Sequence, residues 1–213
     1  MVLGANDGII STSSLLLGVA AADASHSTLL TVGMAALVAG ALSMALGEYV
    51  SVSSQRDSEQ ADIAKEKWEL EHTPELELIE LTAIFRGKGL SEALAGEVAV
   101  ELSRHDALNT HLAEELGIHE STMAQPLQAS IGSALSFAVG SAIPLAVISL
   151  ASQTVRIPAT IAVVIAALGA LGAASSRYGG AHPVRPVVRI VIGGLVAIGL
   201  TMLVGWSFGS AIA

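Results

Sequence analysis

LLTVGMAALVAGALSMALGEYV at residues 29–50 runs directly into SVSSQRDSEQADIAKEKWELEH at residues 51–72. The first stretch carries one charged residue, Glu48. As a helix it is long enough to cross about 30 Å of hydrocarbon. The second stretch carries six acidic and three basic residues, and its composition is compatible with a helix. We therefore expect one helix to continue from a membrane into water.

Four further apolar stretches reach the roughly 20 residues that a membrane-spanning helix needs. Together with the first, the predicted spans are Leu3–Ala22, Leu29–Val50, Ala129–Ala151, Ile157–Ser175 and Val187–Ala211. Hydrophobic residues make up 52% of the chain and charged residues 14%, and the mean hydropathy of +0.66 excludes a soluble globular protein. The runs are continuous rather than alternating, which disfavours strands. The sequence predicts an all-α, polytopic membrane protein with five transmembrane helices.

The charges are concentrated in the middle of the chain. Sixteen of the nineteen Asp and Glu residues lie between Asp57 and Glu120, and the net charge is −9. This balance disfavours nucleic acid as a partner and favours cations. The absence of cysteine excludes disulfides, thiolate metal sites and Cys nucleophiles. No Walker motif is present, so a nucleotide partner is not expected.

The distribution of Lys and Arg predicts the orientation of the spans. Six basic residues lie in residues 51–125 and three between the last two spans, whereas Arg156 alone falls on the opposite side. The positive-inside rule then places the N-terminus and the acidic block in the cytosol. The chain begins without the basic segment of a signal peptide, so we expect the first apolar run to be retained. Aromatic residues make up 3% of the chain, and together these features favour a bacterial inner membrane.

Three segments follow from this pattern. Residues 1–50 hold spans one and two, residues 51–125 form an acidic cytosolic domain, and residues 126–213 hold spans three to five. In the middle segment, Pro74 suits the first turn of a second helix and Ser91 suits the cap of a third. We therefore expect a small cytosolic three-helix domain inserted between spans two and three.

Acidic residues recur at helical spacing on the three predicted helices of this domain, where like charges repel unless a cation offsets them. Oxygen and nitrogen ligands without thiolate suit Fe(II), Mn(II) or Co(II). The same spacing is also typical of a solvated helix face, so the pattern leaves both interpretations open. The candidate metal ligands are Glu66, Glu69, Glu77, Glu80, His111, Glu114 and Glu115, with Glu59 and Asp62 as secondary candidates.

Asp7 is a carboxylate inside the first predicted span. A charge at mid-span costs about 2.5–3.5 kcal/mol on insertion scales, so such a residue is expected to face protein or water. The turn between the first two spans centres near residues 25–26, which places Asp7 and Met44 at a similar depth. Glu48 lies one turn further toward the cytosolic mouth. These three residues are candidate transport-path residues, although Asp7 can also cap its span, Met44 can pack and Glu48 can lie at the interface.

Four motifs resemble the vacuolar iron transporter family. They are GANDG at 4–8, AGALSMALGEYVSVSSQ at 39–55, PELELIE at 74–80 and EELG at 114–117, and the resemblance covers essentially the whole chain. It implies a homodimer of five-span subunits with spans one and two lining a path at the dimer axis. It also implies that span two extends into a three-helix cytosolic metal-binding domain. Such proteins resemble proton-coupled exporters of Fe(II), and often of Mn(II) or Co(II).

The resemblance carries over to individual residues and shows three departures. It supports Asp7 and Met44 as path ligands, and Glu66, Glu69, Glu77, Glu80 and Glu115 as metal ligands. Ala36 stands where many members carry an acidic residue. Either the transport path has fewer ligands in this chain, or Glu48 is more important as a ligand. His111 stands near the place where eukaryotic members have methionine. Members usually carry residues before the first span, which leaves open a native start upstream of Met1.

The leading expectation is a divalent-metal exporter working by proton antiport, not an enzyme. Its partners would be Fe(II), Mn(II) or Co(II), protons, the lipid bilayer and a second copy of the chain, with no permanently bound cofactor. The alternative is a membrane-anchored ferritin-like iron-binding protein or ferroxidase. That chemistry uses Glu-x-x-His, and the chain offers Glu101 with His105 at i, i+4 and His111 with Glu114 in reversed order, so the fit is poor. A third interpretation is a structural membrane protein whose acidic domain docks a basic partner.

Overall fold

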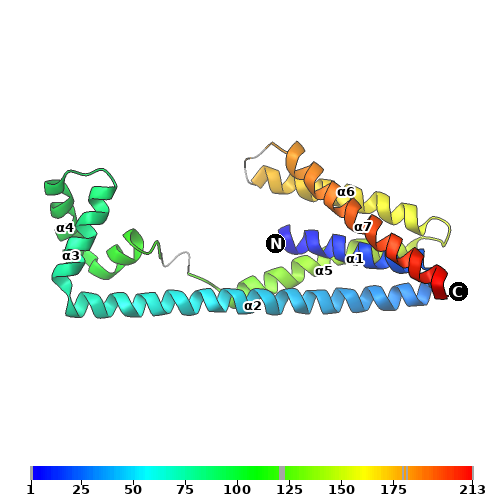
Figure 1. The fold of residues 1–213 in the computed structure, drawn as a ribbon, viewed down its shortest axis with the longest axis horizontal. Coiled ribbons are helices and arrows are strands. Elements are labelled where there is room, and N and C mark those ends of the chain that lie inside the picture. The colour runs from blue at the N-terminus through cyan, green and yellow to red at the C-terminus, as the bar shows by residue number, and fades with distance from the viewer. Residues whose placement is uncertain (1, 120–122, 179, 181, 213) are drawn as a thin grey trace. The chain divides into compact units, whose positions relative to one another are not determined.

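The computed structural model describes residues 2–119, 123–178, 180 and 182–212. Within these residues the chain forms helices and no strand (Figure 1). The helices are α1 (Val2–Ala21), α2 (His26–His72), α3 (Pro74–Gly87), α4 (Glu92–Glu114), α5 (Pro126–Leu150), α6 (Arg156–Tyr178) and α7 (Val184–Ile212).

Five of these helices are long and apolar enough to cross a membrane, namely α1, α2, α5, α6 and α7. The lengths and compositions of these helices confirm the all-α class and the five candidate spans that the sequence predicts. The junction at residues 50 and 51 lies inside one 47-residue helix, α2, as expected.

The chain divides into two compact units. We call Met1–Tyr49 together with Leu127–Ala213 the apolar unit, and Val50–Pro126 the acidic unit. The apolar unit holds α1, the first part of α2, and α5 to α7. The acidic unit holds the rest of α2 together with α3 and α4.

Helix α1 lies at the centre of the apolar unit because it contributes to two separate core clusters. One cluster joins α1 to α6 and α7 through Ile9, Leu17, Val164, Leu168 and Ile198. The other joins α1 to α2 and α5 through Leu16, Ala20, Leu29, Leu145 and Ile148. Every residue in both clusters is an aliphatic side chain or alanine, as expected for helices that pack by shape rather than by charge.

Glycines allow the neighbours of α1 to approach closely. A Cβ atom on Gly8 would overlap the backbone of Phe137 in α5, and one on Gly205 of α7 would overlap the backbone of Gly18. Such close crossings bring backbones into van der Waals contact, which is how spans associate in lipid. The α1–α5 contact also carries hydroxyl groups, since Thr12 donates to Ser141 at 2.9 Å.

The acidic unit has its own small core between α3 and α4, built from Leu81, Phe85, Ala95 and Ala99. Helix α3 begins at Pro74, and Ser91 caps α4 by accepting a hydrogen bond from the Leu94 N–H, as their positions in the sequence predict. Helix α4 is not continuous, however. Asp106 adopts an extended backbone (φ −161°, ψ 88°) inside it.

The break at Asp106 starts a new helical segment. The Asp106 carboxylate accepts hydrogen bonds from the backbone N–H of Asn109 at 3.1 Å and from the Asn109 side chain at 2.7 Å. A side chain that accepts from the N–H three residues ahead is acting as an N-cap. The sequence predicted one uninterrupted third helix, and this prediction is wrong at Asp106. The side-chain cap stabilises the start of a new helical segment here more than a continuous backbone ladder would.

Candidate metal centre

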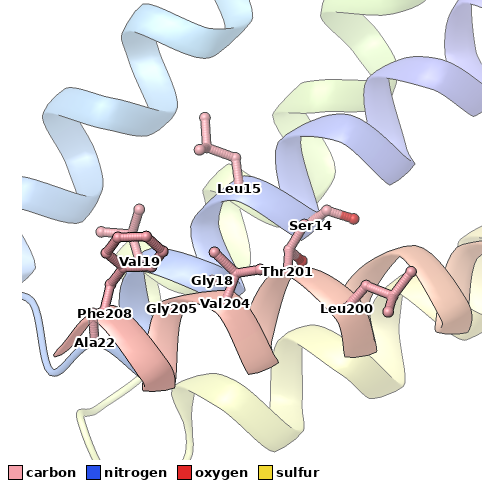
Figure 2. A pocket seen from close by; sticks show the side chains of 10 residues that line it. All are labelled: Ser14, Leu15, Gly18, Val19, Ala22, Leu200, Thr201, Val204, Gly205 and Phe208. Atoms are coloured by element: carbon pink, nitrogen blue, oxygen red, sulfur yellow. The ribbon is translucent and has the colours of Figure 1, made fainter. Parts of the chain in front are cut away.

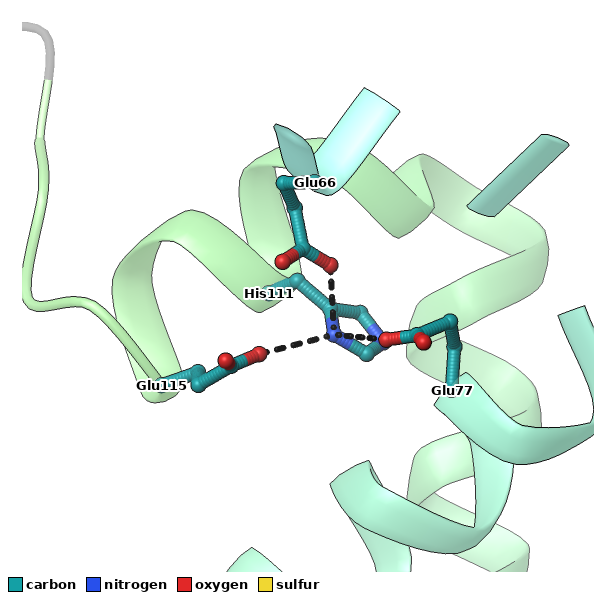
Figure 3. A group of neighbouring side chains, drawn as sticks. All are labelled: Glu66, Glu77, His111 and Glu115. Carbon is teal, nitrogen blue, oxygen red and sulfur yellow. Dashed lines mark hydrogen bonds and ion pairs between the residues drawn. The ribbon is translucent and has the colours of Figure 1, made fainter. Parts of the chain in front are cut away.

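Four potential metal ligands converge in the acidic unit, and they come from all three of its helices. Glu66 lies in α2, Glu77 in α3, His111 in the last turn of α4, and Glu115 directly after it. One ligand atom from each lies within 4.8 Å of every other (Figure 3). In residues 2–119, 123–178, 180 and 182–212, this is the one group of three or more His, Asp or Glu residues placed closely enough to share a cation.

The imidazole of His111 lies in the middle of the group. Its Nδ1 atom lies 3.0 Å from Glu66 Oε1, 3.4 Å from Glu115 Oε2 and 3.8 Å from Glu77 Oε2. Figure 3 shows the three carboxylates arranged around this one nitrogen. Three carboxylates and one imidazole form a mixed oxygen and nitrogen set of the kind that binds first-row divalent metals.

The group is buried. Glu66 is 2% exposed, Glu77 6% and His111 0%, whereas Glu115 is half-buried. Removing carboxylates from water is costly unless they are paired or bind a cation. His111 Nε2 and Glu66 Oε1 have no hydrogen-bond partner among the described residues. The 3.0 Å contact between Glu66 Oε1 and His111 Nδ1 is therefore a close approach without hydrogen-bond geometry.

The electrostatics of the group favour an added positive charge. Burial raises the pKa of Glu66, the charge of Glu115 raises it further, and His111 acts in the opposite direction. Burial also raises the pKa of Glu77, with additional contributions from Glu69 and Glu80. A raised carboxyl pKa means that the negative form is disfavoured without a partner. A proton or a metal ion would relieve the same repulsion.

Two local features bring the ligands together. The chain turns sharply between α2 and α3 at Thr73, whose hydroxyl donates to the Glu69 carbonyl at 3.0 Å (Figure 1). This turn brings Glu66 and Glu77 to one site although they lie eleven positions apart in the sequence. The break at Asp106 starts the short helical segment that carries His111. The helix boundary at Pro74 was predicted from the sequence, but the break at Asp106 that orients His111 was not.

Three of the other predicted metal ligands lie outside the group. Glu69 pairs with Lys65 at 2.9 Å, and Glu114 pairs with Lys88. Glu80 is exposed, although its charge contributes to the raised pKa of Glu77. Glu69 and Glu80 therefore influence the group electrostatically rather than by lying within it.

The two secondary candidates also lie outside the group. Glu59 accepts hydrogen bonds from the Gln55 side chain at 2.9 Å and from the backbone N–H of Ala124 at 3.2 Å. Asp62 is exposed. Glu59 thus ties α2 to the segment that follows α4, which gives it a structural role within the acidic unit.

The predicted path residues are distributed over two helices of the apolar unit. Asp7 lies in α1, and Met44 and Glu48 lie in α2; all three are half-buried. The Asp7 backbone carbonyl accepts a hydrogen bond from Ser11 at 2.6 Å. Among the described residues of one copy, Asp7 and Glu48 join no group of three or more His, Asp or Glu ligands.

The apolar unit also has a groove of about 420 Å³ between α1 and α7 (Figure 2). Its ten lining residues are uncharged, and Leu15, Val19, Val204 and Phe208 form much of its wall. This surface carries no carboxylate or imidazole for a cation, and its oxygen-bearing side chains are the hydroxyls of Ser14 and Thr201.

Two buried polar atoms of α1 were not anticipated from the sequence. Asn6 Oδ1 and Ser14 Oγ have no hydrogen-bond partner among the described residues. Polar residues within a predicted span are a sequence signal for such positions. Asn6 precedes Asp7 directly, so unsatisfied polarity and a carboxylate occur together near the start of α1.

The comparisons with known proteins agree with this architecture. The family model described as the VIT family matches residues 1–206. A vacuolar iron transporter of Acanthamoeba castellanii is 42% identical over 206 residues, which cover 96% of this chain and 76% of the relative. The chain belongs to the VIT family. The resemblance found in the sequence motifs is confirmed.

Plant relatives of this VIT-family chain extend the same comparison. Vacuolar iron transporter homolog 1 of Oryza sativa is 36% identical over 213 residues, covering 98% of this chain and 72% of the relative. Vacuolar iron transporter homolog 2.1 of Arabidopsis thaliana is 34% identical over 211 residues, covering 99% and 80%. Together with the five long apolar helices, the family membership identifies an integral, multi-pass membrane protein.

Proposed function

We propose that this VIT-family chain exports Fe(II), and also Mn(II) or Co(II), from the cytosol in exchange for protons. One observation carries the proposal: three carboxylates and an imidazole converge in the acidic unit, with two of their buried polar atoms lacking partners. The related proteins are named vacuolar iron transporters, which supports a metal ion as the cargo.

The first step in this proposal is capture of the metal in the acidic unit, which acts as a cytosolic domain between spans two and three. The divalent ion would be held by Glu66, Glu77, Glu115 and one nitrogen of His111. The nearby charges of Glu69, Glu80 and Glu114 would attract the ion, and Glu69 and Glu114 could exchange their lysine partners for it. Metal and protons compete for the same carboxylates, so binding of the ion releases protons.

The second step is passage through the membrane by way of Asp7, Met44 and Glu48. Within one copy these half-buried residues do not form a complete ligand set, which supports a homodimer in which a second copy supplies the missing ligands. Protons arriving from the far side would protonate the carboxylates and release the ion. Such a cycle needs no covalent chemistry and no resident cofactor.

The membrane in which this occurs is a separate part of the proposal. The low aromatic content and the basic residues clustered on one side support a bacterial inner membrane, with the N-terminus and the acidic unit in the cytosol. The curated relatives carry the word vacuolar in their names, which describes those proteins.

The test is anaerobic uptake of Fe(II) and Mn(II) into proteoliposomes with an imposed pH gradient, comparing the wild type with Asp7→Asn. We expect gradient-dependent uptake that Asp7→Asn abolishes while metal binding to the purified protein persists. Unchanged uptake in Asp7→Asn would refute the assigned path. Iron oxidation without accumulation in the vesicles would refute export and favour the ferroxidase alternative.

A further inference from the structure

Three arginines lie together at one end of the α6–α7 pair. Arg177 is in the last turn of α6, and Arg185 and Arg189 lie one turn apart at the start of α7; all three are exposed. Gly172 of α6 packs so closely on α7 that a Cβ atom there would lie 2.9 Å from the Val187 Cα. This contact packs the last part of α6, which carries Arg177, against the first part of α7, which carries Arg185 and Arg189.

Within residues 2–119, 123–178, 180 and 182–212, the three guanidinium groups have no acidic partner. No Asp or Glu follows Glu120 in the sequence. The three acidic residues of the apolar unit, Asp7, Asp23 and Glu48, form no ion pair with them among the described residues. Arg156, at the opposite end of α6, differs: it is 4% exposed and donates to the Ala24 carbonyl at 3.1 Å.

The length of α6 places Arg177 at the edge of the hydrocarbon, and the packing of α7 on α6 places the other two arginines near it. Between Arg156 and Arg177 lie twenty uncharged residues, Ile157–Ser176. At 1.5 Å per residue they span about 30 Å, the thickness of a bilayer core. The contact between Gly172 and Val187 sets the register of α7. Arg177 and Arg185 both lie outward from this contact, and Arg189 lies one turn further in than Arg185.

The surroundings match a lipid headgroup region. Tyr178 is 92% exposed beside Arg177, and tyrosine is enriched at the membrane–water boundary. On α7 the exposed residues Val184, Val188 and Ile192 recur at the same four-residue step as the arginines, so an apolar stripe runs alongside the basic one. The positive-inside rule accounts for basic residues on this side, but not for three guanidinium groups near the adjoining ends of two packed helices without an acidic partner among the described residues.

From these features we infer that Arg177, Arg185 and Arg189 form a binding site for the phosphate headgroup of an anionic phospholipid in this leaflet. Guanidinium groups form charge-assisted, often bidentate hydrogen bonds with phosphate. A lipid supplies phosphate at the depth where these side chains lie, and its acyl chains can pack on the apolar stripe of α7. The site is independent of the metal centre and of the transport path.

The test is native mass spectrometry of the purified full chain with equimolar phosphatidylglycerol and phosphatidylcholine. We expect the wild type to retain phosphatidylglycerol preferentially. Each neutralised arginine should weaken its binding roughly fivefold, and Arg177→Gln/Arg185→Gln/Arg189→Gln on the order of a hundredfold. The control, Arg56→Gln/Arg86→Gln/Arg104→Gln, makes the same charge change in the acidic unit and should bind like the wild type.

Equal retention of the two lipids by the wild type, or equal loss in both triple variants, would overturn the inference. The single variant Arg185→Gln keeps the test informative where the triple variant does not insert, since a fivefold loss is still expected. Excess inorganic phosphate at constant ionic strength separates the sources of the anion. Full displacement of phosphatidylglycerol by phosphate alone would identify a free-phosphate site and contradict the lipid assignment.

Discussion

Among the described residues, the acidic unit and the apolar unit each contain two buried side-chain polar atoms without hydrogen-bond partners, but of different kinds. In the acidic unit they belong to Glu66 and His111, whose side chains approach to 3.0 Å within one group of four ligands. In the apolar unit they are a neutral amide oxygen and a hydroxyl, on Asn6 and Ser14, two helical turns apart. The first arrangement is ready to accept a cation within one copy, whereas the second is not.

This difference indicates how the two units divide the proposed function. A buried group of carboxylates is unfavourable until it is neutralised, which supports the proposal that the acidic unit captures the metal ion. The apolar unit is held by glycine contacts and by paired hydroxyls, so it is built for close helix packing. The predictions below test this contrast, beginning with the largest effect.

Glu66→Gln should weaken Fe(II) binding to the purified protein by at least about 100-fold, since even outer-shell changes cost 10–100-fold. The substitution removes one of the four converging ligands and keeps the shape of the side chain. Glu80→Gln is the matched control, because Glu80 is exposed and lies outside the group. The affinity of this variant for Fe(II) should change less than tenfold. Anaerobic titration calorimetry measures both, and equal losses would remove the distinction between the two glutamates.

Gly205→Ala should destabilise the apolar unit by about 1–3 kcal/mol, as overpacking does. The added Cβ atom would overlap the backbone of Gly18. Gly199→Ala in the same helix is the control, since its Cβ atom would meet no neighbour within 4 Å and alanine favours a helix. Thermal unfolding in detergent compares the two variants. Similar melting temperatures would show that the α1–α7 contact is looser than described.

The metal-free acidic unit should lose stability as the pH rises. Burial raises the pKa of Glu66 and of Glu77 above the ordinary value of 4.5, so folding favours their protonated forms. Their contribution is present below pH 4.5 and is lost as the pH rises through the raised values. Saturating Fe(II) should reverse the trend above that window, because the metal replaces the protons.

Chelator-treated protein, unfolded by urea at a series of pH values, provides the measurement. In Glu66→Gln the decline with rising pH should be shallower, because one titrating group has been removed. A metal-free protein whose acidic unit gains stability through this window would contradict the raised pKa of both carboxyls.

Ser141→Ala should have the smallest effect, about 0.6 kcal/mol, the average for hydrogen bonds between spans. It removes the acceptor of the Thr12 hydroxyl and the donor that reaches the Gly8 carbonyl at 3.2 Å. Ser149→Ala is the comparison, because that hydroxyl only bonds the carbonyl of Ala146 within its own helix. Thermal unfolding compares the stability of the two variants. If Ser141→Ala is less stable than Ser149→Ala by more than about 2 kcal/mol, the contact between α1 and α5 contributes more than an ordinary hydrogen bond between spans.

Much of the fold could be predicted because its signals are local. Apolar length predicts the five long helices, and the composition across residues 50 and 51 predicts the continuous α2. The break at Asp106 could not be predicted, because it depends on a side-chain cap that competes with a helix-compatible sequence.

The existence of a group of metal ligands in the acidic unit was easier to predict than the residues that belong to it. Glu66 and Glu69 share a helical stripe, yet Glu66 lies inside the group and Glu69 pairs with Lys65. Glu77 and Glu80 differ in the same way, with one buried and the other exposed. Spacing places both members of each pair near one face, but the direction of the neighbouring helix decides which one reaches His111. The predicted common depth of Asp7 and Met44 stays a prediction.

The most direct test of the account is Fe(II) uptake into proteoliposomes as a function of Fe(II) concentration, under a fixed pH gradient. The wild type, Glu66→Gln and Glu80→Gln are compared with their acidic units facing the added metal. We predict that Glu66→Gln needs a much higher Fe(II) concentration for half-maximal uptake, whereas Glu80→Gln follows the wild type. Superimposable uptake curves for all three proteins would contradict the claim that the buried group captures the transported ion.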